Sequence, residues 1–105
     1  MKISVIVPAF NEEKLLAESL LSMKMAMKAF QTREWDTELV VCDNNSKDGT
    51  AEIARSAGAI VVFEPVNQIA RARNCGAAVA TGDWFVFVDA DSRPTAELFN
   101  AVAEA

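Results

Sequence analysis

The amino-acid sequence predicts a doubly wound α/β fold, in which an open parallel sheet carries helices on both faces. Four short apolar runs alternate along the chain with segments whose apolar residues recur every three or four positions. The first run is nearly continuous, as expected of a parallel strand that is covered on both sides. Polar clusters follow three of the four runs, at the end of the sheet where ligands bind in this class of fold.

In the first half of the chain, strands are predicted at residues 3–7 and 38–42. A helix between them is predicted to begin at Asn11, because asparagine is a good N-cap residue and two acids follow it. The helix is expected to end in a loop at residues 31–37. An apolar stripe marks the face of the helix that is expected to be buried: Leu16, Leu20, Met23, Met27 and Phe30.

In the second half, strands are predicted at residues 59–63 and 84–88, and helices at residues 50–57, 69–81 and 95–105. Three residues mark the ends of these helices: Gly58 and Gly82 follow the first two, and Pro94 precedes the third. The strict alternation of strands and helices implies parallel strands joined by right-handed crossovers.

The length and the net charge of the chain limit the classes of protein to which it could belong. With 105 residues the chain suits one domain, which we expect to span residues 1–105. A formal net charge of -5 argues against a nucleic-acid binder, which would present a basic face. No apolar stretch reaches the roughly 18 residues of a transmembrane helix. The amino terminus lacks a signal-peptide cleavage site, so its apolar run is interpreted as a core strand.

Two residue types restrict the chemistry of the chain. It has no histidine, which excludes Ser–His and Cys–His catalysis and histidine-bound metals within these residues. Cys42 and Cys75 form neither a CxxC motif nor a disulfide framework, and Cys42 is expected to be a core thiol. We therefore expect a reducing, cytoplasmic setting.

The fourth apolar run leads into Asp89-Ala90-Asp91. In an extended chain, positions i and i+2 point the same way, so the two carboxylates are predicted to converge while Ala90 points oppositely. Converging carboxylates repel each other unless water screens them or a cation neutralises them. Mg2+ and Mn2+ prefer oxygen ligands, and Mg2+ commonly shares one or two carboxylates with substrate phosphates. A metal–phosphate site is therefore favoured over a solvated turn.

The other two polar clusters indicate a nucleoside. The turn from Pro8 to Glu13 lacks a glycine-rich fingerprint, and its acids would repel phosphate, so it is expected to face a base or ribose. Asp43 could accept a hydrogen bond from a base N–H or a ribose hydroxyl, whereas residues 46–49 are interpreted as a capped turn. At most one of Arg71 and Arg73 is expected to reach a diphosphate, because they point in different directions on one helix.

Four stretches resemble the amino-terminal, nucleotide-sugar-binding half of family 2 glycosyltransferases, which have the GT-A fold with a Rossmann-like sheet. They are ISVIVPAFNEE, VVCDNNSKDGTAEIA, ARNCGAAVATGDW and FVFVDADS, in the order of the family, and from the first to the last they span nearly the whole chain. The resemblance implies transfer of a sugar from a nucleoside-diphosphate sugar to an acceptor that it does not define. UDP is the favoured nucleotide and GDP the alternative, with Mn2+ or Mg2+ stabilising the departing diphosphate.

The resemblance also implies roles for single residues. Those that would bind the nucleotide sugar are Pro8, Ala9, Phe10 and Glu12 in the first turn, Asp43 at the base, Arg73 near the donor, and Asp89 by the ribose or sugar. Asp91, together with Asp89, would hold the metal. Gln68 departs from the family pattern, because a glycine often stands before the ARN segment.

The second half of the family, which carries the acceptor site and the general base, does not follow within this chain. No residue is therefore assigned as the catalytic base, and the truncated fold is expected to expose an apolar edge through which homo-oligomers could form. A non-catalytic sugar-nucleotide-binding or assembly module, working with a partner chain, is the alternative function. A response-regulator domain is disfavoured because no lysine follows Lys47. A nucleotidyltransferase is disfavoured because the first turn carries acids instead of a basic, glycine-rich loop.

Overall fold

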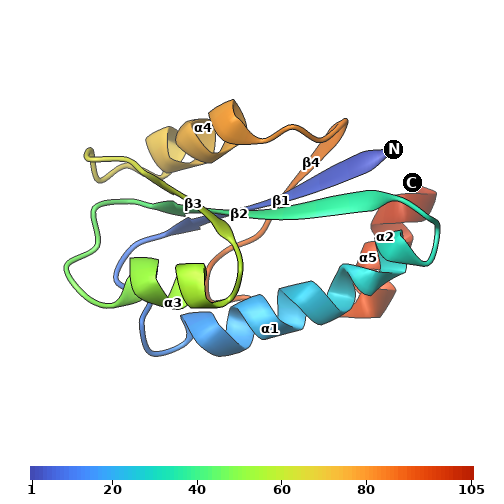
Figure 1. Ribbon diagram of the computed structural model, residues 1–105, viewed down its shortest axis with the longest axis horizontal. Helices are drawn as coiled ribbons and strands as arrows, with labels where there is room; N and C mark the ends of the chain where they lie inside the picture. Colours follow the sequence, from blue (N-terminus) through green and yellow to red (C-terminus); the bar gives the residue numbers. More distant parts are fainter.

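The computed structural model describes residues 1 to 105 and confirms the α/β class with a parallel sheet (Figure 1). The strands are β1 (Lys2–Ala9), β2 (Asp36–Asp43), β3 (Ile60–Phe63) and β4 (Trp84–Phe87), in the spatial order β3-β2-β1-β4. The helices are α1 (Leu16–Ala26), α2 (Lys28–Gln31), α3 (Thr50–Ser56), α4 (Ile69–Val79) and α5 (Ala96–Glu104). Strand order reverses between β1 and β4, and a crevice is expected at the carboxyl ends of these two strands.

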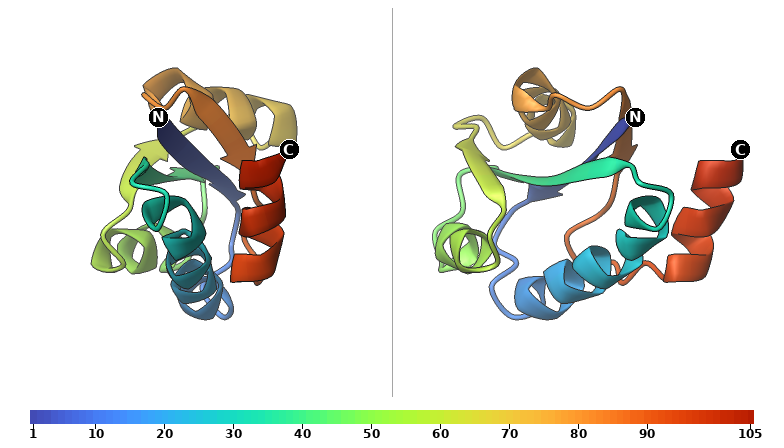
Figure 2. Two further views of the ribbon diagram at one scale, coloured as in Figure 1. Left: turned by 90° about the vertical axis from the view of Figure 1, so that its right-hand side faces the viewer. Right: turned by 45° about the vertical axis from the view of Figure 1, so that its right-hand side comes forward.

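Helices cover both faces of the sheet, as predicted, but they do so unequally. The α4 helix alone lies on one face, and the other helices lie on the opposite face (Figures 1 and 2). That more heavily covered face holds a core of 16 buried residues, in which the stacked rings of Phe30 and Phe99 join α2 to α5 with centroids 5.2 Å apart. On the other face α4 packs closely, since a Cβ at Gly76 would lie 2.6 Å from Ile6 Cγ2.

The first helix begins at Leu16, so the prediction that it begins at Asn11 is wrong. Asn11 has a φ of 51°, in the left-handed region, whereas an N-cap residue is extended. The side-chain oxygen of Asn11 instead accepts from Lys47 N at 2.8 Å, and Glu12 N donates to Thr50 Oγ1 at 2.9 Å. The turn after β1 is therefore bonded to the loop before α3 and to the first residue of α3.

The other boundaries lie close to the predictions. The predicted apolar stripe is buried throughout, although the helix is divided at Met27 into α1 and α2. Gly58 follows α3 with a φ of 83°, as expected of a helix-ending glycine. Cys42 is a core thiol as predicted, and burial, with a contact to the Cys75 thiol, raises the pKa of Cys42 to about 12. No helix has the length and apolar character that crossing a membrane requires.

Candidate functional site

The turns after β1 and β4 meet at the point where the strand order reverses. A cavity of about 200 Å3 lies there, and the residues that line it are Pro8, Ala9, Phe10, Glu12, Asn44, Ile69, Asp89, Ala90 and Asp91. Six of the eight site residues predicted from the sequence are among them; the other two are Asp43 and Arg73. The topology thus brings together most of a set of residues that are far apart in the sequence.

The Asp89-Ala90-Asp91 segment is a turn, so its predicted extended conformation is wrong. The β4 strand ends at Phe87, and Ser92 N donates to Asp89 O at 3.0 Å. Ala90 is buried in the core, whereas Asp89 and Asp91 are exposed. The two aspartates therefore line the cavity because a turn anchored by Ala90 presents them there, and strand alternation is not the cause.

Glu12 faces the same cavity from the turn after β1. Burial raises the pKa of Glu12 above its ordinary value, and the negative charges of Asp91 and Asp48 raise it further. The carboxylates of Glu12 and Asp91 thus repel each other across the cavity. A bound cation would remove this repulsion.

The acids at the cavity fit a divalent cation that takes further ligands from its substrate. No three acidic or cysteine side chains are close enough to form a metal site by themselves. Asp89 and Asp91 offer carboxylate oxygens, which suit Mg2+ and Mn2+. Mg2+ in proteins commonly uses one or two carboxylates and completes its octahedron with water and substrate phosphates. The residues therefore fit a cation shared with a diphosphate better than an all-protein metal centre.

Asp43 and Arg73 lie beside the cavity, outside its lining. Asp43 is 7% exposed, and its Oδ1 accepts from Ser46 N at 3.0 Å, so Oδ2 is the oxygen left for a ligand. Arg73 lines a neighbouring cavity of about 620 Å3, together with Arg93 and Asp89. Asp89 belongs to both cavities and so connects Arg73 to the other predicted residues.

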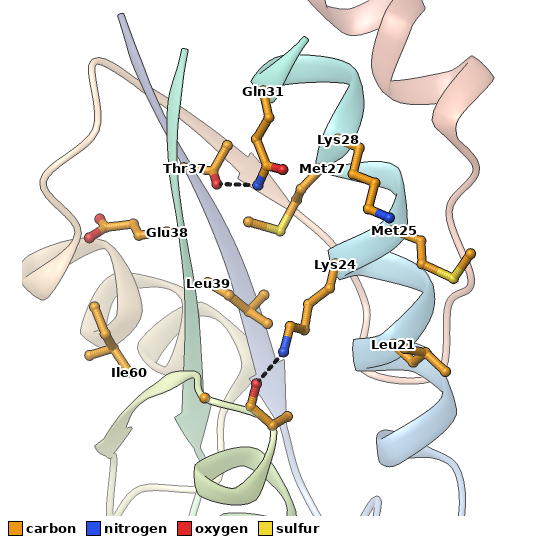
Figure 3. Close-up of a pocket in the computed structure, with 12 residues that line it drawn as sticks. Leu21, Lys24, Met25, Met27, Lys28, Gln31, Thr37, Glu38, Leu39 and Ile60 are labelled. Carbon is orange, nitrogen blue, oxygen red and sulfur yellow. Dashed lines mark hydrogen bonds between the residues drawn. The ribbon is translucent and has the colours of Figure 1, made fainter. Parts of the chain in front are cut away.

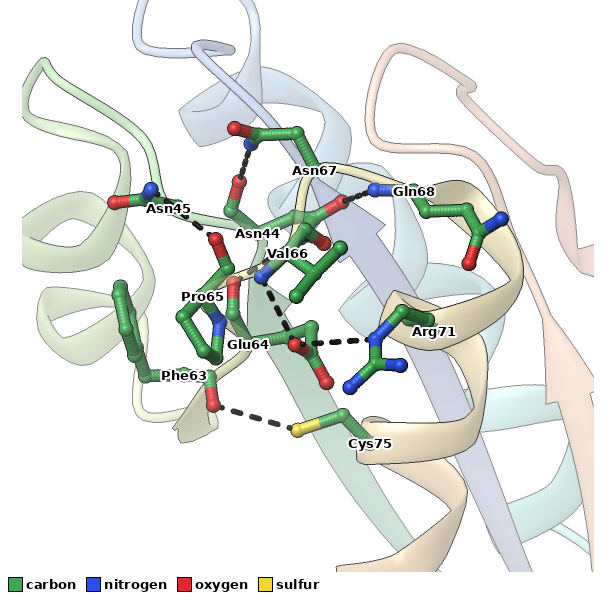
Figure 4. A network of polar contacts seen from close by, with 10 residues as sticks. All are labelled: Asn44, Asn45, Phe63, Glu64, Pro65, Val66, Asn67, Gln68, Arg71 and Cys75. Carbon is green, nitrogen blue, oxygen red and sulfur yellow. Dashed lines mark hydrogen bonds and ion pairs between the residues drawn. The ribbon is translucent and has the colours of Figure 1, made fainter.

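Asn44 and Ile69 line the cavity but were not predicted as site residues. Asn44 follows β2 and is buried, and its side chain is bonded to the loop between β3 and α4 (Figure 4). The available signal was its position next to Asp43, directly after an apolar strand. Ile69 is the first residue of α4, and an isoleucine at a helix start gives no sequence signal of a ligand site.

A larger cavity, of about 620 Å3, lies between α1 and the first residues of β2 and β3 (Figure 3). Lys24 Nζ donates to Ala57 O at 2.8 Å, and Gln31 Nε2 donates to Thr37 Oγ1 at 3.1 Å. The Glu38 side chain points away from this cavity (Figure 3). The cavity lies at the amino half of the sheet, and it contains none of the polar residues that follow the strands.

The chain matches the family model described as "Glycosyl transferase family 2" over residues 4–105. It is 38% identical over 96 residues to the 4,4'-diaponeurosporenoate glycosyltransferase of Staphylococcus haemolyticus. That match covers 85% of this chain and 24% of the relative.

Solved structures that share the fold include two with a nucleotide sugar bound. TarS from S. aureus in complex with UDP-GlcNAc has a TM-score of 0.79 and 34% identity, over 99% of this chain and 30% of TarS. The mannosyltransferase PcManGT from Pyrobaculum calidifontis, in complex with GDP-Man and Mn2+, has a TM-score of 0.79 and 33% identity, over 95% of this chain and 31% of that protein. The chain spans less than a third of the length of each of these three proteins.

Proposed function

Because the chain belongs to glycosyltransferase family 2, we propose that it binds the nucleoside-diphosphate sugar of a metal-dependent glycosyl transfer. The observation that carries the proposal is the cavity at the carboxyl ends of β1 and β4, which gathers two exposed aspartates and Glu12. UDP is the favoured nucleotide, and the UDP-GlcNAc complex of TarS supports it. GDP is the alternative, because PcManGT binds GDP-Man with Mn2+.

Each predicted residue in or beside the cavity has a proposed role. The turn of Pro8, Ala9, Phe10 and Glu12 would lie against the nucleoside, and Asp43 Oδ2 would accept from the base. Asp89 would contact the ribose or sugar and, with Asp91, hold Mn2+ or Mg2+. Arg73, beside Asp89, would lie near the donor sugar and diphosphate. When bound, the cation would stabilise negative charge on the departing nucleoside diphosphate.

The repulsion between Glu12 and Asp91 supports a cation at this place. In the free protein, burial and neighbouring acids disfavour the Glu12 carboxylate and raise its pKa. A divalent cation at Asp91 would reverse the sign of the nearest charge. The acids therefore repel one another in the free cavity, and a cation bound together with a diphosphate would compensate their charge.

Melting temperatures test the proposal. The chain is heated with UDP, GDP or ADP, each with Mn2+ and with EDTA. Ligand at about 100 times its dissociation constant adds roughly 2.7 kcal/mol to the free energy of unfolding. For a chain of this size we expect UDP with Mn2+ to raise the melting temperature by about 10 °C or more. UDP in EDTA, and Mn2+ alone, should give smaller shifts. The proposal would be contradicted if none of the three diphosphates raised the melting temperature in Mn2+.

A further inference from the structure

We propose that Asn44 is a positioning residue for the donor cavity, and that it holds the start of α4 so that Ile69 and Arg73 keep their places. The choice of nucleotide as ligand rests on the proposed function. The hold of Asn44 on α4 rests on the geometry of the chain alone.

Asn44 is 5% exposed, and the three hydrogen bonds of its side chain are all made to one loop (Figure 4). Its Nδ2 donates to Glu64 O at 3.1 Å and to Val66 O at 2.6 Å, and its Oδ1 accepts from Gln68 N at 3.2 Å. One carboxamide thus satisfies three backbone groups between β3 and α4. No other side chain makes as many hydrogen bonds to the backbone of this loop.

The backbone of Asn44 forms two further hydrogen bonds, one to the end of β1 and one to the loop between β3 and α4. Asn44 N donates to Ala9 O at 2.8 Å, at the end of β1, and Asn44 O accepts from Asn67 Nδ2. Ala9 and Asn44 both line the donor cavity. The residue therefore links the end of β1, which lines the cavity, to the loop that leads to Ile69, another residue of the lining.

Besides the buried Ala72 and the close packing of Gly76 on Ile6, few polar contacts hold the start of α4. Gln68, at its N-cap position, provides no side-chain cap. The Glu64–Arg71 ion pair is 3.6 Å long with an exposed guanidinium, and Asn45 Nδ2 binds only Pro65 O, at 3.2 Å. A surface pair of this kind contributes little. Asn44 is thus the main anchor of the loop.

The position of this loop decides which α4 residues face the site. Ile69, the first residue of α4, lines the donor cavity, and Arg73 lines the neighbouring cavity with Asp89. Residues four apart lie on the same side of a helix, so a shift in the start of α4 moves both side chains together. Asn44 acts on the ligand through these two residues.

The network also explains why an amide is required. An aspartate of the same shape could still accept from Gln68 N, but it would have no donor for Glu64 O and Val66 O. Its charge would face both carbonyl oxygens. Asn44→Asp is therefore a nearly isosteric change that releases the loop.

The test compares wild type, Asn44→Asp and Arg73→Ala with the double variant, by calorimetric titration of UDP in Mn2+. Loss of the loop anchor should raise the dissociation constant of UDP roughly tenfold in Asn44→Asp, the effect of about one net hydrogen bond and its unpaired partner. Arg73→Ala should weaken binding in wild type and have little further effect in Asn44→Asp. Backbone amide NMR signals of Gln68 and Ile69 should shift in Asn44→Asp without any nucleotide.

The control is Glu38→Gln, which is expected to lower stability from the opposite end of the sheet and to leave UDP binding unchanged. If Asn44→Asp does not fold, Asn44→Ser is measured in its place. The proposal would be overturned if Asn44→Asp binds UDP as tightly as wild type and leaves the amide signals of Gln68 and Ile69 unshifted. It would also be overturned if the effects of Asn44→Asp and Arg73→Ala on the dissociation constant are additive. If wild type binds neither UDP nor GDP in Mn2+, the proposed function fails, and the amide shifts of Gln68 and Ile69 still decide whether Asn44 holds α4.

Discussion

The pKa values of carboxylates at the two ends of the sheet are shifted in opposite directions. At the amino end, Glu38 accepts from Ser4 Oγ and Thr81 N, each at 2.6 Å, and lies 3.4 Å from Lys2 Nζ. Burial raises the pKa of Glu38, but hydrogen bonds from these partners outweigh it, and the pKa is lowered. At the carboxyl end, burial and the charges of Asp91 and Asp48 raise the pKa of Glu12.

This difference distinguishes an acid whose charge is compensated by protein groups from acids whose charges would be compensated by a bound cation. Glu38 joins β2 to β1 and to the chain before β4, so its negative charge stabilises the fold. Glu12 and Asp91 repel each other beside a cavity, so their charges cost stability until a cation is bound. A cluster of acids therefore indicates a ligand site only when the chain itself leaves their charges uncompensated.

The largest effect is expected at the amino end. Glu38→Ala should lower the free energy of unfolding by about 3 kcal/mol, because the backbone N–H of Thr81 and the hydroxyl of Ser4 lose their acceptor. Urea denaturation measures the change. As a control, Glu52→Ala breaks an exposed ion pair with Arg55 and should cost less than about 0.5 kcal/mol. Equal losses in the two variants would contradict the role given to Glu38.

The pH dependence of stability tests whether the charge of Glu38 is the cause of its contribution to the free energy of unfolding. Since its folded pKa is lowered, its contribution is present above its ordinary pKa of 4.5 and is lost as pH falls through the folded pKa. Wild type and Glu38→Gln should therefore differ most in stability at neutral pH and converge in acid. A difference that stays constant down to the acid transition would assign the effect to packing alone.

The next largest effect is expected on binding at the carboxyl end. Asp91→Asn should weaken UDP binding in Mn2+ by about 2 kcal/mol, or roughly 30-fold, because it removes a charged ligand of the metal. Its melting temperature without ligand should stay the same or rise. Asp36→Asn, at the exposed start of β2, is the matched control and should bind as wild type does. Equal affinities in the two variants would show that Asp91 does not hold the metal.

The smallest effect is expected at Glu12. Because its folded pKa is raised, the protonated form contributes stability below the ordinary pKa of 4.5, and this is lost as pH rises through the folded pKa. Glu12→Gln should therefore match wild type in acid and exceed it at pH 7 by about 0.5 kcal/mol, a screened, partly exposed interaction. Thermal unfolding across pH measures the difference.

Metal and nucleotide sharpen this prediction. With Mn2+ and UDP bound, the Glu12 carboxylate no longer faces an uncompensated charge, so the advantage of Glu12→Gln should disappear. A variant that is less stable than wild type at pH 7 without ligand would contradict the repulsion between Glu12 and Asp91.

Most of the fold and much of the candidate site could be predicted from local patterns. Continuous apolar runs predicted the strands. The acidic residues near the strand ends, together with the family resemblance for Pro8, Ala9 and Phe10, predicted six of the residues that line the cavity. The start of the first helix was missed because Asn11 bonds across to Lys47, a tertiary contact that overrides its N-cap preference. The turn at Asp89 and the anchoring role of Asn44 were missed for the same reason, since burial of Ala90 and the loop at Val66 depend on distant segments.

The central claim is that metal and nucleotide bind together at the carboxyl ends of β1 and β4. Mn2+ is paramagnetic and broadens the NMR signals of nearby nuclei, so an amide spectrum with UDP and small amounts of Mn2+ locates the cation. We expect broadening at Phe10, Glu12, Asp89 and Asp91, with sharp signals at Glu38 and Thr81 at the other end of the sheet. The claim would be contradicted if Mn2+ broadened the amide signals at the amino end of the sheet. It would also be contradicted if UDP did not change the broadening.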